Sequence, residues 1–222
     1  MFIGHFALGF AAKRAIPWLP LAVLFAAAQL ADIIWPFLVA TGIEQVRIEP
    51  GVTAFTPLEF VWYPYSHSLL FLTIWGLLFG AVCAAIVGNR RALPWILALV
   101  VSHWVLDWIT HGPDMPLYPD SARFGLGLWN SIAGTILVET ALFAAGVWIY
   151  IRSTRARDRI GSVGLAALIV FLLAAYVGSL SGPPPSVTAL VVVSIAGAAI
   201  IVSWAWWFDR HRTPLPKTDP GR

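Results

Sequence analysis

Long apolar runs separated by short polar segments make up most of the chain. Each run contains about 20 residues, which is the length that an α-helix needs to cross a hydrocarbon core about 30 Å thick. The pattern therefore predicts an all-α fold, a polytopic bundle of membrane-spanning helices. We place six spanning helices, at residues 17–41, 63–87, 93–111, 127–151, 160–181 and 186–208.

A shorter apolar stretch at residues 2–12 precedes the first span, and it is too short to cross a membrane. We interpret it as a half-helix that enters from Lys13 and Arg14. The following segment loosely resembles a signal peptide, with Ala26-Ala27-Ala28 in the place of a cleavage site. Because the apolar run continues as far as residue 40, we expect an uncleaved spanning helix instead.

The spans are interpreted as one integral-membrane domain at residues 1–208. Residues 1–151 contain the ionisable side chains that lie within spans, whereas residues 160–208 form a helical hairpin around a proline-rich turn. The polar tail at residues 209–222 is expected to be cytoplasmic and disordered.

Composition and charge agree with this class of protein. The chain is 59% hydrophobic and 11% charged, whereas soluble domains average about 25% charged residues. Of its 14 Lys and Arg residues, only Arg47 and Arg123 lie outside when the N-terminus is placed in the cytoplasm. This bias predicts that both termini are cytoplasmic. It also explains the net charge of +3 without a nucleic-acid partner, and the expected partner is the lipid bilayer.

Ionisable side chains interrupt several of the apolar runs. His103, Asp107 and His111 recur at four-residue steps, which places them on one face of the third spanning helix. Ionisable residues are expensive inside a membrane and commonly mark a functional site. Positions along the helices put Asp32 and His103 at one level, roughly 13 Å below the outer surface. The same estimate puts His67 at a higher level, with Asp107 and just below His111.

Histidine and carboxylate side chains without a thiolate suit zinc, with manganese or iron as alternatives. His103 and His111 would lie about 12 Å apart along a helix, so one ion cannot bind both. We therefore expect His111 to cap the helix or to support a ligand from behind. The candidate metal ligands are His5, Asp32, His67, His103 and Asp107, and the candidate catalytic bases are Asp32 and Glu139. Two ions bridged by Asp107 or Asp32 are a second arrangement.

Each of these residues also has a purely structural interpretation. His67 lies close to the headgroup region, where an interfacial role would suffice. His103 and Asp107 could form a pair that only stabilises their helix. Glu139 could serve only to pair with a histidine, and His5 could be a structural residue on an apolar turn.

Four short motifs in chain order resemble the YdjM-like family. They are Gly4-His5, Ala31-Asp32, Ser66-His67-Ser68-Leu69-Leu70 and Ser102-His103-x-x-x-Asp107-x-x-Thr110-x-Gly112. The resemblance covers about residues 1–130. It implies a LexA-regulated, membrane-bound, metal-dependent hydrolase of the bacterial inner membrane. Five residues of these motifs carry the resemblance, and the resemblance implies that they form the polar site. They are His5, Asp32, His67, His103 and Asp107.

The chain departs from the family's pattern at two places. The family often has a Pro-Asp-x-Asp pair, whereas here Asp32 is followed by Ile33-Ile34-Trp35. The family's His-Arg-Gly before Thr-His-Ser is replaced by Tyr63-Pro64-Tyr65. The smaller number of acidic ligands favours one metal over two.

Three functions are compatible with the sequence. The first is a hydrolase with an outward-facing His/Asp site that acts on a lipid-proximal ester or phosphoester. The second is a proton- or ion-coupled transporter, in which Asp32, His103, Asp107 and Glu139 line a pathway. The third is a non-catalytic membrane protein.

Overall fold

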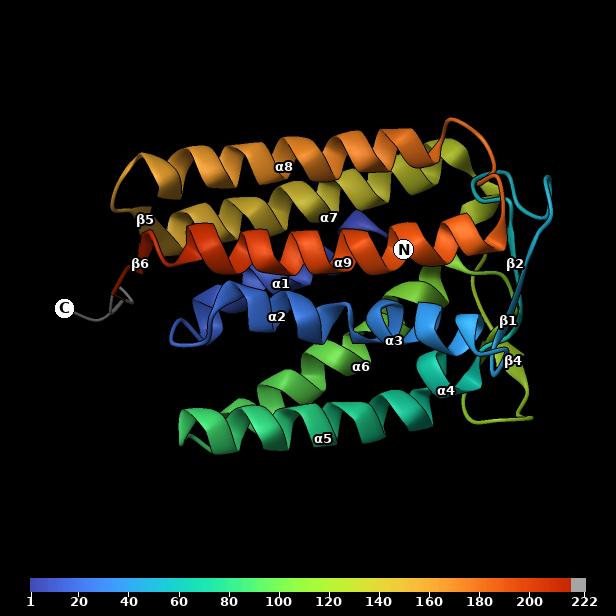
Figure 1. The fold of residues 1–222 in the computed structure, drawn as a ribbon, viewed down its shortest axis with the longest axis horizontal. Coiled ribbons are helices and arrows are strands. Elements are labelled where there is room, and N and C mark those ends of the chain that lie inside the picture. Colours follow the sequence, from blue (N-terminus) through green and yellow to red (C-terminus); the bar gives the residue numbers. More distant parts are fainter. Residues whose placement is uncertain (217–222) are drawn as a thin grey trace.

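The computed structural model describes residues 1–216 as a bundle of long helices whose loops gather at its two ends (Figure 1). Within this range, five helices are long and apolar enough to cross a membrane, and a bent pair, α2 (Leu21–Ala28) with α3 (Leu30–Ala40), makes a sixth span if it is counted as one. The five are α5 (Leu69–Val87), α6 (Ala92–Thr110), α7 (Ile132–Ser153), α8 (Arg159–Ser179) and α9 (Val187–Asp209). The predicted helical membrane bundle is confirmed.

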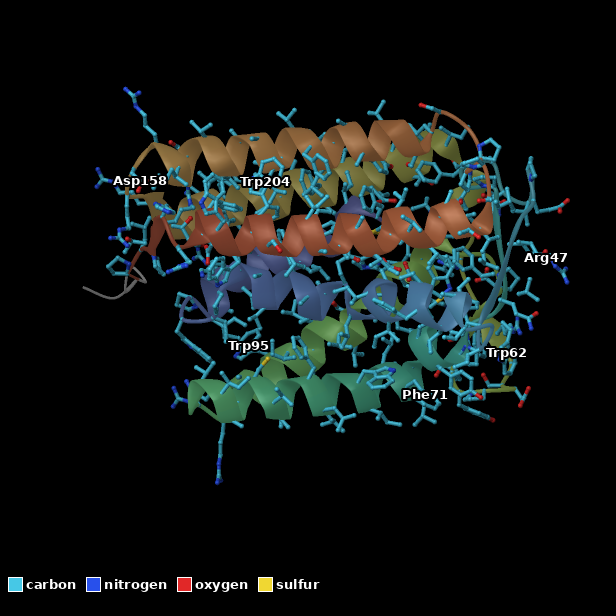
Figure 2. The ribbon with its side chains drawn as sticks, in the orientation of Figure 1. Arg47, Trp62, Phe71, Trp95, Asp158 and Trp204 are labelled. Atoms are coloured by element: carbon cyan, nitrogen blue, oxygen red, sulfur yellow. The ribbon has the colours of Figure 1, made fainter. Side chains whose placement is uncertain are left out.

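Apolar side chains cover the outside of this bundle. Large residues such as Ile86, Val193 and Leu137 are among the most exposed in the protein, at 80%, 69% and 68%. Side chains of this kind project outward along the long helices (Figure 2). Such a surface is unfavourable in water and favourable in lipid, because apolar area exposed to water raises the free energy of the folded state.

Two of the predicted spans are not continuous helices. The predicted helix at 17–41 is broken at Gln29, where α2 and α3 meet at an angle of 57°. The predicted helix at 63–87 is divided at Ser68 into the short α4 (Pro64–His67) and α5. Ser68 has extended backbone angles, and its hydroxyl accepts a hydrogen bond from Phe71 N at 3.2 Å, so it begins a new helix instead of continuing the old one. Both breaks matter because they lie beside the polar cluster described below.

The short N-terminal helix α1 (Ile3–Ala15) lies inside the bundle and contacts α7 and α2. Its residues Ile3, Phe6 and Phe10 are buried in the same apolar cluster as Phe25 and Phe143. The predicted N-terminal half-helix is therefore present. Because its first residues lie midway along the bundle, His5 is carried deep into the interior (Figure 1).

One end of the bundle, which we call the hairpin end, carries most of the irregular structure (Figure 1). Strand β1 (Gln45–Ile48) pairs antiparallel with β2 (Leu58–Trp62), and β3 (Met115–Pro116) pairs with β4 (Arg123–Phe124). The short helix η1 (Leu128–Asn130) precedes α7. The loops at 42–62 and 112–126 thus contain paired strands that their sequences did not predict.

The opposite end, which we call the arginine end, contains the first part of the predicted tail in ordered structure. Helix α9 extends to Asp209, and β6 (Arg212–Pro214) pairs antiparallel with β5 (Thr154–Ala156). The Arg212 side chain fixes this pairing by donating to Thr154 O and to Gly161 O. Residues 209–216 are therefore ordered. The local pattern does not predict this order, because the pairing partner β5 lies far away in the sequence. The rest of the predicted tail lies outside the described residues.

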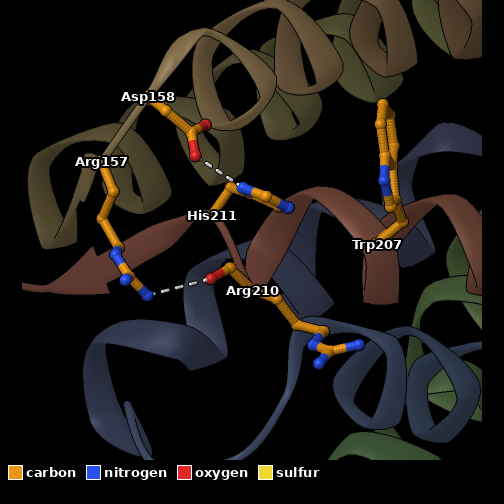
Figure 3. A pocket seen from close by; sticks show the side chains of 5 residues that line it. All are labelled: Arg157, Asp158, Trp207, Arg210 and His211. Carbon is orange, nitrogen blue, oxygen red and sulfur yellow. Dashed lines mark hydrogen bonds and ion pairs between the residues drawn. The ribbon is translucent and has the colours of Figure 1, made fainter.

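A shallow cavity of about 340 Å³ lies at the arginine end, between β5 and the end of α9 (Figure 3). His211 Nδ1 lies 2.6 Å from Asp158 Oδ2, and Arg157 donates to the Arg210 carbonyl at 3.5 Å (Figure 3). The hydrogen bond from His211 holds the pKa of Asp158 below its usual value. These contacts tie the ordered start of the tail to the loop before α8.

A buried ion pair joins four helices near the arginine end. Lys13 Nζ on α1 lies 2.7 Å from Asp209 Oδ2 on α9. The same carboxylate accepts hydrogen bonds from Leu21 N on α2 at 2.9 Å and from the Tyr150 hydroxyl on α7 at 2.6 Å. Every group of the pair is thus hydrogen-bonded, which offsets the desolvation of the two charges.

Replacing Lys13 by Met should destabilise the protein strongly, because Asp209 would remain as an uncompensated buried charge. Breaking such a pair typically costs about 3–5 kcal/mol. The measurement is the melting temperature of the detergent-purified protein. Arg47→Met is the control, since Arg47 and Glu59 form an exposed pair at 3.5 Å that contributes about 0–1 kcal/mol. Equal melting temperatures for the two variants would contradict this role.

Gly146 allows α1 and α7 to approach closely. A Cβ atom there would lie 2.3 Å from the carbonyl oxygen of Ala7, which is backbone and cannot move aside. We expect Gly146→Ala to lower the melting temperature by an amount equivalent to about 1–3 kcal/mol of overpacking. Gly197→Ala is the matched control, because none of the described atoms lies within 4 Å of the added group. A Gly146→Ala protein as stable as the control would show that this contact is not tight.

Candidate metal centre

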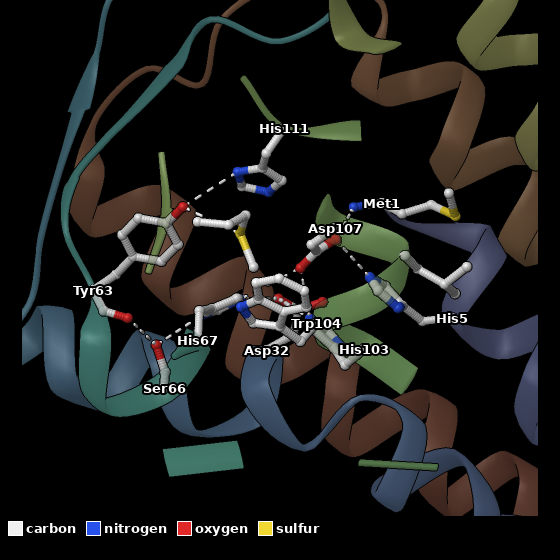
Figure 4. A network of polar contacts seen from close by, with 12 residues as sticks. Met1, His5, Asp32, Tyr63, Ser66, His67, His103, Trp104, Asp107 and His111 are labelled. Carbon is white, nitrogen blue, oxygen red and sulfur yellow. Dashed lines mark hydrogen bonds and ion pairs between the residues drawn. The ribbon is translucent and has the colours of Figure 1, made fainter. Parts of the chain in front are cut away.

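Three histidines and two aspartates from four helices converge inside the bundle (Figure 4). His5 lies on α1, Asp32 in the first turn of α3, His67 at the end of α4, and His103 and Asp107 on α6. They form two overlapping groups, His5–His103–Asp107 and Asp32–His67–His103, and in each group the ligand atoms lie within 4.8 Å of one another. The structure thus brings together all five residues that the sequence suggested as ligands.

Asp107 lies at the centre of the cluster and presents one oxygen to each side. Its Oδ1 lies 3.0 Å from His5 Nε2, and its Oδ2 lies 3.0 Å from His103 Nε2 and 3.9 Å from His67 Nε2. The amino group of Met1 also donates to Oδ1, at 2.5 Å. Asp107 is 2% exposed, so its charge is neutralised by these neighbours and not by water.

Asp32 completes the cluster on the other side. Its Oδ1 lies 3.4 Å from His67 Nε2 and 3.8 Å from His103 Nε2. Two ligand atoms on a tetrahedral ion, each about 2.1 Å from it, lie about 3.4 Å apart. The spacings in this cluster are close to that value. Unlike the other members, Asp32 is accessible, with 41% of its side chain exposed.

The orientation of His103 leaves a nitrogen lone pair facing this cluster. Its Nδ1 lies 2.8 Å from the carbonyl oxygen of Ala28, which can only accept a hydrogen bond, so Nδ1 carries the proton. The break at Gln29 makes that carbonyl available, because α2 ends there. The buried Nε2 has no hydrogen-bond partner among the described residues, although it lies 3.0 Å from Asp107 Oδ2.

Two acceptors that face each other in a buried site need a proton or a metal cation between or beside them. A metal cation would satisfy both the imidazole lone pair and the carboxylate, and the ligand set of nitrogen and oxygen without sulfur suits such an ion. The His5 ring stacks on the His103 ring at a centroid distance of 3.7 Å, which keeps both imidazoles in fixed orientations. These residues therefore could hold a metal ion.

The predicted division of the site into two levels is wrong. His67 was placed with His111 near the outer surface, yet it contacts Asp32, and its ring lies 5.3 Å from that of His103. The reason is the break at Ser68, since α4 no longer continues the axis of α5. One cluster replaces the two levels.

Glu139 and His111 lie outside both groups. Glu139 Oε2 accepts hydrogen bonds from Phe2 N at 2.8 Å and Gly4 N at 3.3 Å, at the N-terminus of α1, where a negative charge is favourable. His111 follows the last turn of α6, and its N–H donates to the Asp107 carbonyl at 2.7 Å. A catalytic role for Glu139 and a supporting role for His111 stay predictions.

Glu44, in the loop before β1, is a buried acidic residue that does not lie within any of the predicted spans. Its side chain is buried, and it accepts hydrogen bonds from Tyr65 N and Ser66 N, both at 2.8 Å, and from the Ser66 hydroxyl at 2.6 Å. Burial raises the pKa of Glu44, and the hydrogen bonds from Ser66 and Tyr65 oppose that rise. No feature of the neighbouring sequence distinguishes Glu44 from the exposed acidic residues.

Comparisons with known proteins give one match. The sequence model of the YdjM inner membrane protein family matches residues 1–183. This range contains the whole cluster and ends in the loop between α8 and α9. No curated protein and no solved structure matches the chain.

His103→Ala should remove bound divalent metal from the purified protein, because His103 belongs to both groups. His111→Ala should retain it, because His111 belongs to neither. Elemental analysis of both proteins beside the wild type makes this comparison. A loss of metal in His111→Ala, with His103→Ala unaffected, would move the site toward the hairpin end.

Proposed function

The chain belongs to the YdjM inner membrane protein family, and we propose that it is a membrane-embedded, metal-dependent hydrolase. The observation that carries the proposal is the buried His103 Nε2, which faces Asp107 without a hydrogen-bond partner among the described residues. We further propose that the substrate is a lipid-proximal ester or phosphoester.

His5, His67 and His103, with Asp107 and Asp32, would hold the ion, and zinc is the first candidate, with manganese or iron as alternatives. A divalent ion supplies Lewis-acid polarisation of a carbonyl or phosphoryl oxygen and lowers the pKa of water. Asp32 is the candidate base, because it is the accessible member of the cluster. The buried Asp107 holds two of the imidazoles in place.

We propose that the arginine end lies in the cytoplasm and the hairpin end outside. The support is the bias of Lys and Arg, which places Arg152, Arg155, Arg157 and Arg159 together at one end of α7 and α8. On this orientation the site opens outward. A cavity of about 370 Å³ at the hairpin end is lined in part by Phe60, Asp114 and Trp129, all of which contact His111. His111 is one helical turn from Asp107, so the cavity neighbours the cluster.

A coupled transporter is the second candidate, and Glu139 favours it. Its Oε1 is buried and has no hydrogen-bond partner among the described residues, as expected of a carboxylate that exchanges a proton. The test is solute or ion flux into proteoliposomes. If Glu139→Gln abolishes the flux that the wild type shows, this result would support transport and would count against hydrolysis as the main activity.

The metal-loaded protein should hydrolyse a member of a panel of lipid esters and phosphoesters. Asp32→Asn should lower the rate by about 10²- to 10⁴-fold, which is the contribution expected of a general base. Glu49→Gln, in the exposed loop between β1 and β2 and away from the lining of the cavity at the hairpin end, is the control and should leave the rate unchanged. Absence of metal from the wild type would contradict the metal site. Bound metal without hydrolysis of any substrate would instead favour a non-catalytic membrane protein.

A further inference from the structure

We infer that Glu44 acts through the Ser66 hydroxyl as a positioning residue for His67, holding the imidazole in the tautomer whose Nε2 lone pair faces the cluster. The tautomer follows from the structure alone. Its consequence for metal affinity rests on the proposed metal site.

The inference starts from a chain of two short hydrogen bonds. His67 Nδ1 lies 2.6 Å from Ser66 Oγ, and Ser66 Oγ lies 2.6 Å from Glu44 Oε2. A carboxylate can only accept, so the single hydroxyl hydrogen of Ser66 is donated to Glu44. The Ser66 oxygen must then accept from His67, and Nδ1 carries the proton. The remaining nitrogen, Nε2, keeps its lone pair and faces Asp32 Oδ1 at 3.4 Å.

Hydrogen bonds favour the ionised form of Glu44 that this chain requires, and they oppose the rise in pKa that burial causes. Its two oxygens accept three hydrogen bonds, from Tyr65 N, Ser66 N and the Ser66 hydroxyl. Hydrogen bonds donated to an ionised carboxylate are shorter and stronger than neutral ones. Glu44 N also donates to the Leu38 carbonyl near the end of α3, at 3.1 Å. Through its backbone N–H and its carboxylate together, Glu44 therefore ties α3, which carries Asp32, to α4, which carries His67.

This arrangement is the one that metal-binding histidines commonly use. Their second ring nitrogen donates to a carboxylate, a carbonyl or a water, which fixes the ring and raises the basicity of the ligating nitrogen. His103 has a neutral partner of this kind, the Ala28 carbonyl. His67 has a charged partner reached through a hydroxyl, so Glu44 contributes to the site although it touches no member of the cluster.

The first test measures the tautomer of His67 in the metal-free protein by nitrogen-15 NMR of labelled histidine. The wild type should show a protonated Nδ1 and an unprotonated Nε2. Ser66→Ala should lose this preference, whereas the matched control Ser68→Ala should keep it, because the Ser68 hydroxyl caps α5 by accepting from Phe71 N. A protonated Nε2 in the wild type would overturn the inference, whatever the protein does with metal.

The second test measures zinc affinity by competition with a chelator. Ser66→Ala and Glu44→Gln should bind zinc about 10- to 100-fold more weakly than the wild type, which is the usual effect of losing such a partner. Ser68→Ala should bind as the wild type does, even if losing the cap lowers its melting temperature. Because Glu44→Gln also loses backbone contacts and could fail to fold, Ser66→Ala decides the outcome.

The two tests separate this inference from the proposed function. If the wild type binds no zinc but shows the expected tautomer, the metal-dependent function fails and the hydrogen-bond chain stands. If zinc binds equally well to Ser66→Ala and to the wild type, the metal site stands and the positioning role of Glu44 is overturned.

Discussion

The buried carboxylate of Asp107 is the group on which the interior of this protein depends. A charge in a membrane-embedded bundle has no water to solvate it, so the surrounding helices must supply its partners. His5 and His103 flank its two oxygens, each at 3.0 Å. His103 comes from the same helix, but His5 reaches the site only because α1 is inserted into the core. The inserted half-helix thus supplies one of the partners that this buried charge needs.

The position of α1 is in turn fixed at both of its ends. Glu139 accepts hydrogen bonds from the first N–H groups, and Lys13 pairs with the buried Asp209 near the last turn. Between these points Gly146 lets the two backbones approach closely. Because the imidazole of His5 belongs to a candidate metal group, contacts remote from the cluster determine the cluster's geometry.

Helix breaks provide the remaining ligands. The break at Gln29 places Asp32 in the first turn of a new helix and leaves the Ala28 carbonyl to orient His103. The break at Ser68 turns His67 toward Asp32, and the first-turn N–H groups of α4, which have no partner within the helix, donate to Glu44. Irregular backbone inside a membrane protein is tolerated only where it is buried or lines a site, and both breaks meet this condition.

These breaks also explain how far the sequence could predict the structure. The spans follow from the lengths of apolar runs, and the five clustered residues follow from ionisable side chains inside those runs. The kink at Gln29, the strand that Arg212 and its neighbours form, and the burial of Glu44 depend on partners far away in the chain. Local pattern therefore predicts the wrong level for His67 and does not identify Glu44 as a buried residue.

X-ray absorption at the metal edge of the zinc-loaded protein tests whether a metal binds at the Asp107 cluster, because it reports the ligand atoms themselves. The account predicts nitrogen and oxygen neighbours at about 2.0–2.2 Å, with the outer-shell signature of imidazole and no sulfur. That imidazole signature should weaken in His103→Ala. A spectrum of hydrated zinc without imidazole, or one unchanged by the substitution, would contradict a metal centre built around Asp107.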